Sequence, residues 1–337
     1  MAHTVTFLPR QLNLTVAEGE SVLQAALRQG FRIPWGCSSG SCRACEGRLK
    51  FGRVQLKHCA GEVSASDSAA DSILCCLAYP IEDIQIEVHK VLAPGQFPTQ
   101  EITAQITHIK QINPDVKIVQ FKLPAGKKIE YSAGQYLEII LDSDISAAFS
   151  IANAPRDDRT LELHIRASQD SVSYPLLKPQ LKEGELLRLR LPLGNTTLHR
   201  LEHAKTLIMI AASTGISQMI AMLQALITAG DERPVFVYWG ARLVRDLYLH
   251  DEMKTLVMRH PNCRYIAIVS DQPEWPARKG LVHRAVLDDR NDFKDTAIIV
   301  GGSPAMVYAT YDDFIAAGID AGQIISDVFD YAPREAQ

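Results

Sequence analysis

The sequence is poor in the features that mark nucleic-acid-binding, membrane-spanning and secreted proteins. Among its 337 residues, 35 Lys and Arg nearly balance 39 Asp and Glu, and the formal net charge is -4. Nucleic-acid-binding domains usually carry a basic face, so we expect no nucleic-acid partner. No apolar run approaches the ~20 residues that span a bilayer, and the N-terminal residues show no charged segment followed by an apolar one, as a secretory signal would. We therefore expect a cytoplasmic protein without a membrane span.

Cysteine is also scarce over most of the chain, because Cys263 stands alone in the last three quarters. The other cysteines all lie before residue 77: Cys37, Cys42, Cys45, Cys59, Cys75 and Cys76. Disulfide frameworks belong to small secreted domains, so thiols gathered at one end of this chain favour a metal site. Cys59 stands apart from the other cysteines in the sequence and is interpreted as a free thiol.

The spacing of the thiols indicates which metal site they form. Cys37, Cys42 and Cys45 make a C-x4-C-x2-C run, and the adjacent pair Cys75 and Cys76 follows about thirty residues later. This is the plant-type [2Fe–2S] pattern, with three thiolates from one loop and a distant fourth. A structural zinc site usually shows two short cysteine pairs, and unliganded thiols are the other alternative. The spacing alone leaves the fourth ligand open between the two adjacent cysteines.

The first 90 residues read as a small sheet with one helix, and we assign them to one domain. Alternating apolar residues predict the strands, and a helical period closed by a glycine predicts the helix. The predicted hairpin covers residues 3–8 and 12–16, the helix residues 21–30, and later strands residues 47–56 and 83–92. Pro and Gly punctuate residues 91–100, which we interpret as a linker.

The rest of the chain shows two patterns. Residues 101–201 contain short apolar segments separated by Pro- and Gly-containing turns, which predict an antiparallel barrel or sandwich. In residues 202–337 buried strands alternate with helices, which predicts a doubly wound parallel sheet. The expected architecture is therefore multidomain, with an α+β domain, an antiparallel β-barrel and an α/β domain in that order.

Several motifs fall at the carboxyl ends of predicted strands, where a doubly wound sheet binds its ligand. AASTGIS at 211–217 and VGGSPAM at 300–306 are strand-to-helix glycine turns, and a helix N-terminus attracts a pyrophosphate. Arg242 ends another strand, and DVFDY brings Phe329 and Tyr331 to the end of a last strand. The structural alternatives are a glycine turn without a ligand, a surface ion pair for the arginine, and core packing for the aromatics.

In their order along the chain, these motifs resemble known families. Cys76 opens a C-x-A-Y-P stretch similar to the one at the last cysteine of plant-type ferredoxins, which makes it the implied fourth ligand and implies a β-grasp fold. AFSIANAP at 148–155 and LELHIRA at 161–167, with the turns above, resemble the ferredoxin–NADP⁺ reductase superfamily. The order of modules is similar to that of oxygenase reductase components and of deoxysugar-pathway reductases of the CDP-6-deoxy-glucoseen type. The resemblance covers almost the whole chain.

The resemblance implies a flavin-binding barrel, a nicotinamide-binding sheet and a set of cofactor residues. Those residues are Phe149 and Ser150 at the flavin ring, His164, Arg166 and Ser173 at the flavin phosphates, Thr214 and Gly215 at the nicotinamide turn, Gly302, Ser303 and Pro304 at the turn beyond it, and Asp327 and Phe329 where the flavin site closes. Arg242 adds a guanidinium for phosphate or ribose. FAD is the expected flavin.

The chain departs from the family's pattern at several positions. Ala147 replaces the arginine of the flavin motif R-x-[Tyr/Phe]-S, and a lost charge-assisted hydrogen bond costs about 1.5–3 kcal/mol, or ten- to a hundredfold in affinity. Asp170 replaces a glycine of the second phosphate motif. Ser213 and Gln218 stand where the nicotinamide turn usually has Gly and Pro, and Gly301 stands where it usually has Cys. We therefore expect FAD to be loosely held.

The implied activity is electron transfer from NAD(P)H through FAD and the [2Fe–2S] cluster to a partner protein, with the terminal oxygenase of a multicomponent mono- or dioxygenase as the expected acceptor. Asp271 would repel a 2′-phosphate, so NADH is expected and NADPH is the alternative. Other readings are a deoxysugar-pathway or free-flavin reductase, and a non-enzymatic electron carrier or redox sensor that kept the cluster without flavin turnover.

Overall fold

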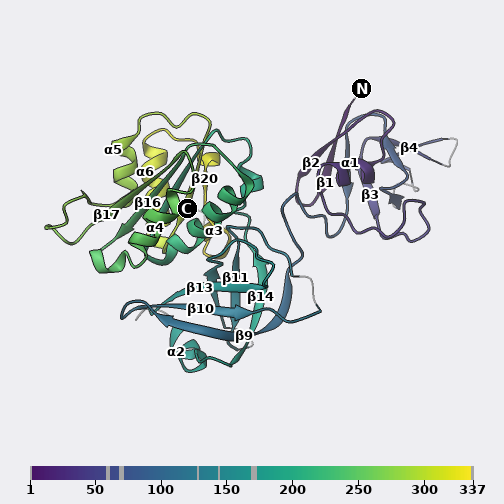
Figure 1. The fold of residues 1–337 in the computed structure, drawn as a ribbon. Helices are drawn as coiled ribbons and strands as arrows, with labels where there is room; N and C mark the ends of the chain where they lie inside the picture. Colours follow the sequence, from purple (N-terminus) through teal and green to yellow (C-terminus); the bar gives the residue numbers. More distant parts are fainter. Residues whose placement is uncertain are drawn as a thin grey trace. The chain divides into compact units, whose positions relative to one another are not determined.

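The chain folds into two compact units, Met1–Gln96 and Phe97–Gln337, each with its own apolar core (Figure 1). The structure is a computed structural model, and it describes residues 2–57, 61–67, 72–126, 129–142, 145–167 and 173–334. Cys59 and Asp170, two positions singled out in the sequence, lie outside these ranges.

The first unit is the expected β-grasp domain. A five-stranded sheet has the order β2-β1-β8-β3-β6, and a three-stranded sheet has the order β5-β4-β7. The elements are β1 (His3–Leu8), β2 (Leu12–Val16), α1 (Val22–Arg28), β3 (Glu46–Phe51), β4 (Arg53–Leu56), β5 (Glu62–Ser64), β6 (Ile73–Leu74), β7 (Ala78–Pro80) and β8 (Ile84–Glu87). A capping box starts α1, because Ser21 and Gln24 each accept the other's backbone N–H with their side chains.

Residues 91–96, the first part of the predicted linker, belong to this unit. Val91 is buried in its core, and Leu92 pairs with Arg32 through backbone hydrogen bonds. Gln96 accepts the N–H of Ala93 through its side chain.

The second unit begins with a six-stranded antiparallel sheet that curls into a barrel. Its order is β12-β11-β14-β9-β10-β13, and a bridge between Ile151 and Leu163 joins the two edges. The elements are β9 (Gln100–Gln111), β10 (Val116–Lys122), β11 (Tyr136–Ile140), β12 (Ser146–Ser150), β13 (Thr160–Arg166), α2 (Ser173–Leu177) and β14 (Leu186–Leu193). Buried and exposed residues alternate at the start of β9, as a strand with one face in the core requires.

The rest of the second unit is the expected doubly wound sheet, with the parallel order β18-β17-β16-β15-β19-β20. The elements are β15 (Thr206–Ala212), α3 (Ile216–Ala229), β16 (Val235–Ala241), α4 (His250–Val257), β17 (Cys263–Val269), β18 (Arg278–Lys279), α5 (Val282–Asp289), β19 (Thr296–Gly301), α6 (Pro304–Ala316), β20 (Ile324–Ile325) and α7 (Val328–Tyr331). One apolar cluster packs α3 and α4 on one face, and another packs α5 and α6 on the other. Because β16 and β19 flank β15, the strand order reverses there, where such sheets bind their ligands.

The C-terminal segment DVFDY differs from its predicted place at the end of a strand. The last strand, β20, ends at Ile325, and the segment forms the start and body of α7. Residues two apart therefore lie on different sides of a helical turn, which separates Phe329 from Tyr331.

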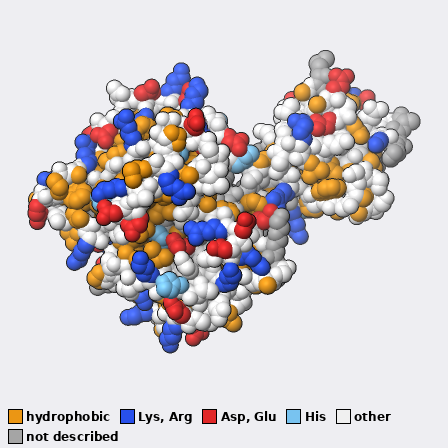
Figure 2. Space-filling view, in the orientation of Figure 1, with side chains coloured by type: hydrophobic (Ala, Val, Ile, Leu, Met, Phe, Trp, Pro, Cys, Tyr) orange, Lys and Arg blue, Asp and Glu red, His pale blue; other side chains and the backbone are white. Residues whose placement is uncertain are grey.

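No helix in the described ranges is long and apolar enough to cross a membrane. On the face drawn in Figure 2, basic and acidic side chains are interspersed over the second unit. This mixture agrees with the near balance of charges in the sequence.

Candidate functional site

The first candidate site is the thiol loop between α1 and β3. Cys37, Cys42 and Cys45 lie on this loop, and the Sγ atoms of Cys37 and Cys42 are 3.3 Å apart. Gly40 has a φ of +84°, and a Cβ there would lie 2.7 Å from Leu77 Cδ1. Glycine therefore lets the loop lie against the segment that follows β6.

The backbone of this loop favours anionic sulfur. The N–H of Cys42 donates to Cys37 Sγ at 3.3 Å, and the N–H groups of Cys42 and Ser39 lower the pKa of the Cys37 thiol to about 6. Because the thiolate is the metal ligand, the loop suits a cluster. In the described part of the chain, no three His, Cys, Asp or Glu side chains are grouped to hold a single ion. A two-iron cluster instead spreads its four ligands over two metals.

The two adjacent cysteines have different surroundings. The thiol of Cys76 contacts Cys45 and the backbone of Gly40, and burial raises its pKa to about 11. Cys75 is fully buried, which raises its pKa further; its N–H donates to the Cys45 carbonyl at 3.0 Å, and its own carbonyl accepts the N–H of Leu23 at 2.9 Å. Cys76 therefore has the better position to complete the loop's ligand set, while Cys75 is held in the core.

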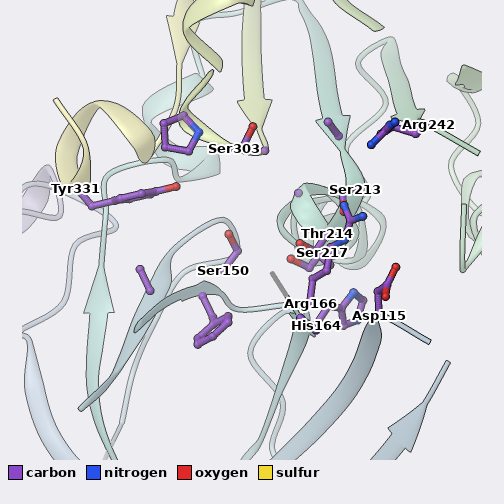
Figure 3. Close-up of a pocket in the computed structure, with 17 residues that line it drawn as sticks. Asp115, Ser150, His164, Arg166, Ser213, Thr214, Ser217, Arg242, Ser303 and Tyr331 are labelled. Atoms are coloured by element: carbon purple, nitrogen blue, oxygen red, sulfur yellow. The ribbon is translucent and has the colours of Figure 1, made fainter. Parts of the chain in front are cut away.

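The second candidate site is a cavity of about 690 Å³ in the second unit (Figure 3). It lies where β12 and β13 of the barrel meet the carboxyl ends of β15 and β19. Its lining comprises Asp115, Ala148, Phe149, Ser150, His164, Arg166, Ala167, Ala212, Ser213, Thr214, Gly215, Ser217, Arg242, Gly302, Ser303, Pro304 and Tyr331. Its volume is in the range of small-molecule and cofactor sites, roughly 300–1,000 Å³.

β12 forms one part of the barrel wall of the cavity. Phe149 lines the cavity and also packs against the barrel core, and Ser150 follows it at the cavity edge. Ala147 is only 5% exposed and does not line the cavity, whereas Ala148 does. This strand therefore presents no charged side chain to a phosphate.

The residues predicted to bind the flavin phosphates do not all lie at the cavity. His164 and Arg166 line the cavity from β13, whereas Ser173 begins α2 and does not. The buried imidazole of His164 is already engaged: Nδ1 lies 2.8 Å from the hydroxyl of Tyr248, and Nε2 lies 3.4 Å from a carboxylate oxygen of Glu162. Arg166 is therefore the residue of this predicted set with a charge to offer.

The two glycine turns face each other at the ends of β15 and β19. A Cβ on Gly215 would lie 2.2 Å from the carbonyl oxygen of Gly301, so only glycine fits this approach. Thr214 and Pro304 line the cavity beside them, and Ser303 caps α6 by accepting the N–H of Met306. Such a backbone cradle, with a helix N-terminus behind it, suits a dinucleotide pyrophosphate.

The C-terminal residues are arranged differently from the prediction. Phe329 packs between Tyr308 and Tyr311, with ring centroids 5.6 Å apart in both pairs, and does not line the cavity. Tyr331 lines it instead, 5.7 Å from the ring of Tyr136. The helical turn in DVFDY is the signal that would have distinguished the two aromatics.

Asp327 also lies behind the cavity wall and not on it. Its carboxyl is buried and accepts hydrogen bonds from Thr196 Oγ1 at 2.8 Å and Gln218 Nε2 at 2.6 Å. Burial raises its pKa to about 7. The side chain therefore joins the barrel to α3 without facing a ligand.

A second cavity, of about 490 Å³, adjoins the first at the ends of β16 and β17. The two cavities share Arg166, Ala212, Ser213, Arg242 and Ser303. Together they offer an elongated ligand a continuous path over the edge of the sheet. Asp115 lines the first cavity without having been singled out, because it stands in no motif, and Ser217, the last residue of the AASTGIS turn, lines it as well.

Comparisons with known proteins match each of the three expected domains. Three family models match in order: the 2Fe-2S iron-sulfur cluster binding domain at residues 5–80, the oxidoreductase FAD-binding domain at 103–198 and the oxidoreductase NAD-binding domain at 209–312. The matches confirm the [2Fe–2S] cluster, FAD and NAD(P)H as cofactors.

Two curated relatives and one solved structure cover nearly the full length. The CDP-6-deoxy-L-threo-D-glycero-4-hexulose-3-dehydrase reductase of Yersinia pestis is 31% identical over 98% of this chain and 99% of its own. The reductase component DmpP of phenol 2-monooxygenase from Pseudomonas sp. (strain CF600) is 31% identical over 92% of this chain and 89% of its own. The crystal structure of the Amycolatopsis cytochrome P450 reductase GcoB superposes with a TM-score of 0.65 at 25% identity, over 96% of this chain and 98% of that one.

The surroundings of the adjacent cysteines predict opposite outcomes for their substitution. We expect Cys76→Ser to abolish the visible absorption of the [2Fe–2S] cluster, because a thiolate ligand is lost. Cys75→Ala should retain it, with a lower stability of the first unit because a buried side chain is removed. Visible absorption and iron content of the two purified variants measure this. Loss of the cluster in the Cys75 variant alone would reverse the assignment.

The buried carboxyl of Asp327 predicts a pH-dependent stability. Its pKa is about 7 in the folded protein against an ordinary value of 3.8. The unfolded chain therefore loses this proton first, and stability falls as the pH rises from about 4 to 7, by at most about 1.4 kcal/mol per pH unit. Asp327→Asn, which cannot ionise, should show a shallower fall.

Calorimetric unfolding at pH 5, 6, 7 and 8 checks this, with visible absorption identifying the transition of the cluster-binding unit. The difference between the two proteins cancels the titration of other groups. Parallel pH profiles for wild type and variant would contradict the prediction.

Proposed function

The chain belongs to the family of reductases that join a 2Fe-2S ferredoxin domain to FAD- and NAD-binding oxidoreductase domains, and we propose that it delivers its electrons to the terminal oxygenase of a multicomponent oxygenase. As a member of this family it is an NAD(P)H-dependent iron–sulfur flavoprotein oxidoreductase. When bound, these cofactors would supply the redox chemistry: hydride from the nicotinamide, exchange between two-electron and one-electron transfer at the flavin, and one-electron transfer at the cluster.

The residues of this chain position those groups and set their electrostatics. In our proposal Cys37, Cys42, Cys45 and Cys76 hold the cluster. Phe149 and Ser150 orient the flavin ring, with Tyr331 in place of Phe329 as the aromatic at the closing side, and Arg166 binds the flavin phosphates. The turns at Thr214, Gly215, Gly302, Ser303 and Pro304 hold the nicotinamide dinucleotide.

The choice of acceptor is supported by a relative's role. The Pseudomonas relative is the reductase component of a phenol monooxygenase and matches almost the whole chain. The Yersinia relative, a hexulose dehydrase reductase, matches as well and supports a dehydrase as the second candidate acceptor.

The two candidate acceptors are distinguished by supplying the purified protein, with NADH, to a terminal oxygenase and to a hexulose dehydrase that each lack their own reductase. Product formation in only one mixture identifies the acceptor class.

We further propose the cytoplasm as its location. The cysteines within the described ranges form no disulfide, and Cys263 stands apart from the proposed cluster ligands. Free thiols are usual where the compartment is reducing.

The proposed electron path predicts the visible spectrum. Under anaerobic conditions, NADH should bleach the flavin and cluster bands together. Because Ala147 lacks the phosphate-binding arginine, preparations should contain less flavin than cluster, and added FAD should restore full bleaching. Titration with NADH, with and without FAD, measures this. Cluster bands that stay unbleached even with FAD present would contradict the proposed path.

The surroundings of Arg242 predict the choice of nucleotide. Its Nε donates to Asp271 at 2.7 Å, and Ser270 donates to the same carboxylate. Both hydrogen bonds lower the pKa of Asp271, so the carboxylate is ionised. Asp271 pairs with Arg242 and follows Ser270, and both of these residues line the second cavity. A carboxylate so close to the cavity disfavours a 2′-phosphate, and we propose NADH as the preferred donor.

We expect Asp271→Asn to raise kcat/KM for NADPH by roughly tenfold, because the repulsion is removed and the arginine is freed. The value for NADH should change little. Asp312→Asn is the matched control, since it breaks an Arg–Asp pair with Arg334 elsewhere and changes the net charge equally. An equal response of both variants would show that net charge alone is responsible.

A further inference from the structure

The two arginines that line both cavities differ in how their charge is compensated. Arg242 forms an ion pair with Asp271 at 2.7 Å. Arg166 donates from Nη1 to the hydroxyl of Ser213 at 2.8 Å and forms no ion pair with a carboxylate among the residues that the structure describes. A hydroxyl is neutral, so the positive charge of Arg166 remains available to an anion in the cavity.

The backbone that carries this hydroxyl is held by a buried side chain. The carbonyl of Ser213 accepts the indole N–H of Trp239 at 2.9 Å, and this tryptophan is fully buried. Ser213 has a φ of +52°, a left-handed conformation that glycine adopts without strain. The turn does not need serine for its backbone, and what serine adds is the hydroxyl.

The hydrogen bond also joins two parts of the second unit. Arg166 is the last residue of β13 in the barrel, and Ser213 follows β15 in the parallel sheet. Figure 3 shows Arg166 extending from the barrel toward the Ser213–Thr214 turn. β12, which contains Ala147 and Ala148, has no cationic side chain.

We propose that Ser213 is a positioning residue that holds Arg166 toward the flavin phosphates and so offsets the arginine missing at Ala147. The inference rests on the proposed role of Arg166 in flavin binding. A guanidinium has five N–H donors, so one bond to Ser213 leaves the others for phosphate oxygens. Because the long side chain is already ordered, less of its conformational freedom is lost when the phosphate binds.

The test is the affinity of the flavin-depleted, full-length protein for FAD and for riboflavin, measured by flavin fluorescence. In Ser213→Gly the positive φ is retained and only the hydroxyl is lost. We expect FAD to bind about three- to tenfold more weakly, less than for the loss of a hydrogen bond made directly to the phosphate, because Ser213 acts only through Arg166. Riboflavin, which has no phosphate, should bind with unchanged affinity.

A double-mutant cycle provides the control. Arg166→Ala should weaken FAD binding more than Ser213→Gly, and adding the glycine substitution to it should have no further effect, because the hydroxyl acts through the guanidinium. Additive losses would overturn the proposal. So would equal losses of FAD and riboflavin affinity, which would show that Ser213 only maintains the fold of the turn.

The outcomes also separate this inference from the proposed function. If wild type binds FAD and Ser213→Gly binds it equally well, the positioning role is wrong and the electron path stands. If wild type binds neither flavin and NADH does not bleach the cluster with FAD present, both are wrong. Unchanged visible cluster absorption and an unchanged unfolding temperature in each variant confirm that the protein is folded.

Discussion

The buried carboxyl of Asp327 connects the parts of the second unit that together form its cavity. It accepts hydrogen bonds from Thr196 of the barrel and from Gln218 of α3, and the same Gln218 amide donates to the carbonyl of Gly134 in the barrel. The fit is close, since a Cβ on Gly194 would lie 2.5 Å from the carboxylate oxygen of Asp327. Because the cavity walls come from both the barrel and the sheet, the cavity exists only while this junction holds. The buried carboxyl of Asp327, whose pKa is raised, thus serves to hold the barrel against the parallel sheet.

Once the barrel is docked, the sheet determines what the cavity can bind. Parallel strands end at one edge, so the turns after β15 and β19 meet there, and Gly215 lies so close to Gly301 that there is no room for a Cβ. These turns offer backbone N–H groups to a pyrophosphate, while Phe149, Ser150 and Tyr331 offer a ring and hydroxyls on the barrel side. Two basic side chains of the cavity already have partners. Arg242 is paired with Asp271, and His164 is held by Tyr248 and Glu162. Because the other two basic side chains of the cavity, Arg242 and His164, are already engaged, the site depends on accurate placement of Arg166.

Two departures from the family pattern, at positions distant in the sequence, both concern Arg166. The barrel lacks an arginine at Ala147, and the nicotinamide turn has Ser213 where glycine is usual. They are far apart in sequence, yet the serine hydroxyl holds Arg166, a cationic residue that lines the same cavity. The first unit shows a similar effect, because Cys75 and Cys76 are adjacent in sequence, yet the Cys76 thiol contacts the thiol loop while the Cys75 thiol is fully buried in the core. In both places the role of a residue depends on the residues that lie next to it in the folded protein.

The sequence by itself determined the order of domains, the strand and helix patterns, the cluster-type cysteine spacing and the glycine turns, because these features are local. Alternation, helical period and short motifs are set by residues within a few positions of one another. Only the tertiary structure decided that Phe329 is a core residue while Tyr331 reaches the cavity, that Asp327 lies behind the wall, and that Ser173 is outside it. These assignments depend on a helical turn and on the docking of a barrel against a sheet, which bring together residues more than a hundred positions apart. Packing between distant segments leaves no periodic signal in the chain, and so it is seen only in the folded protein.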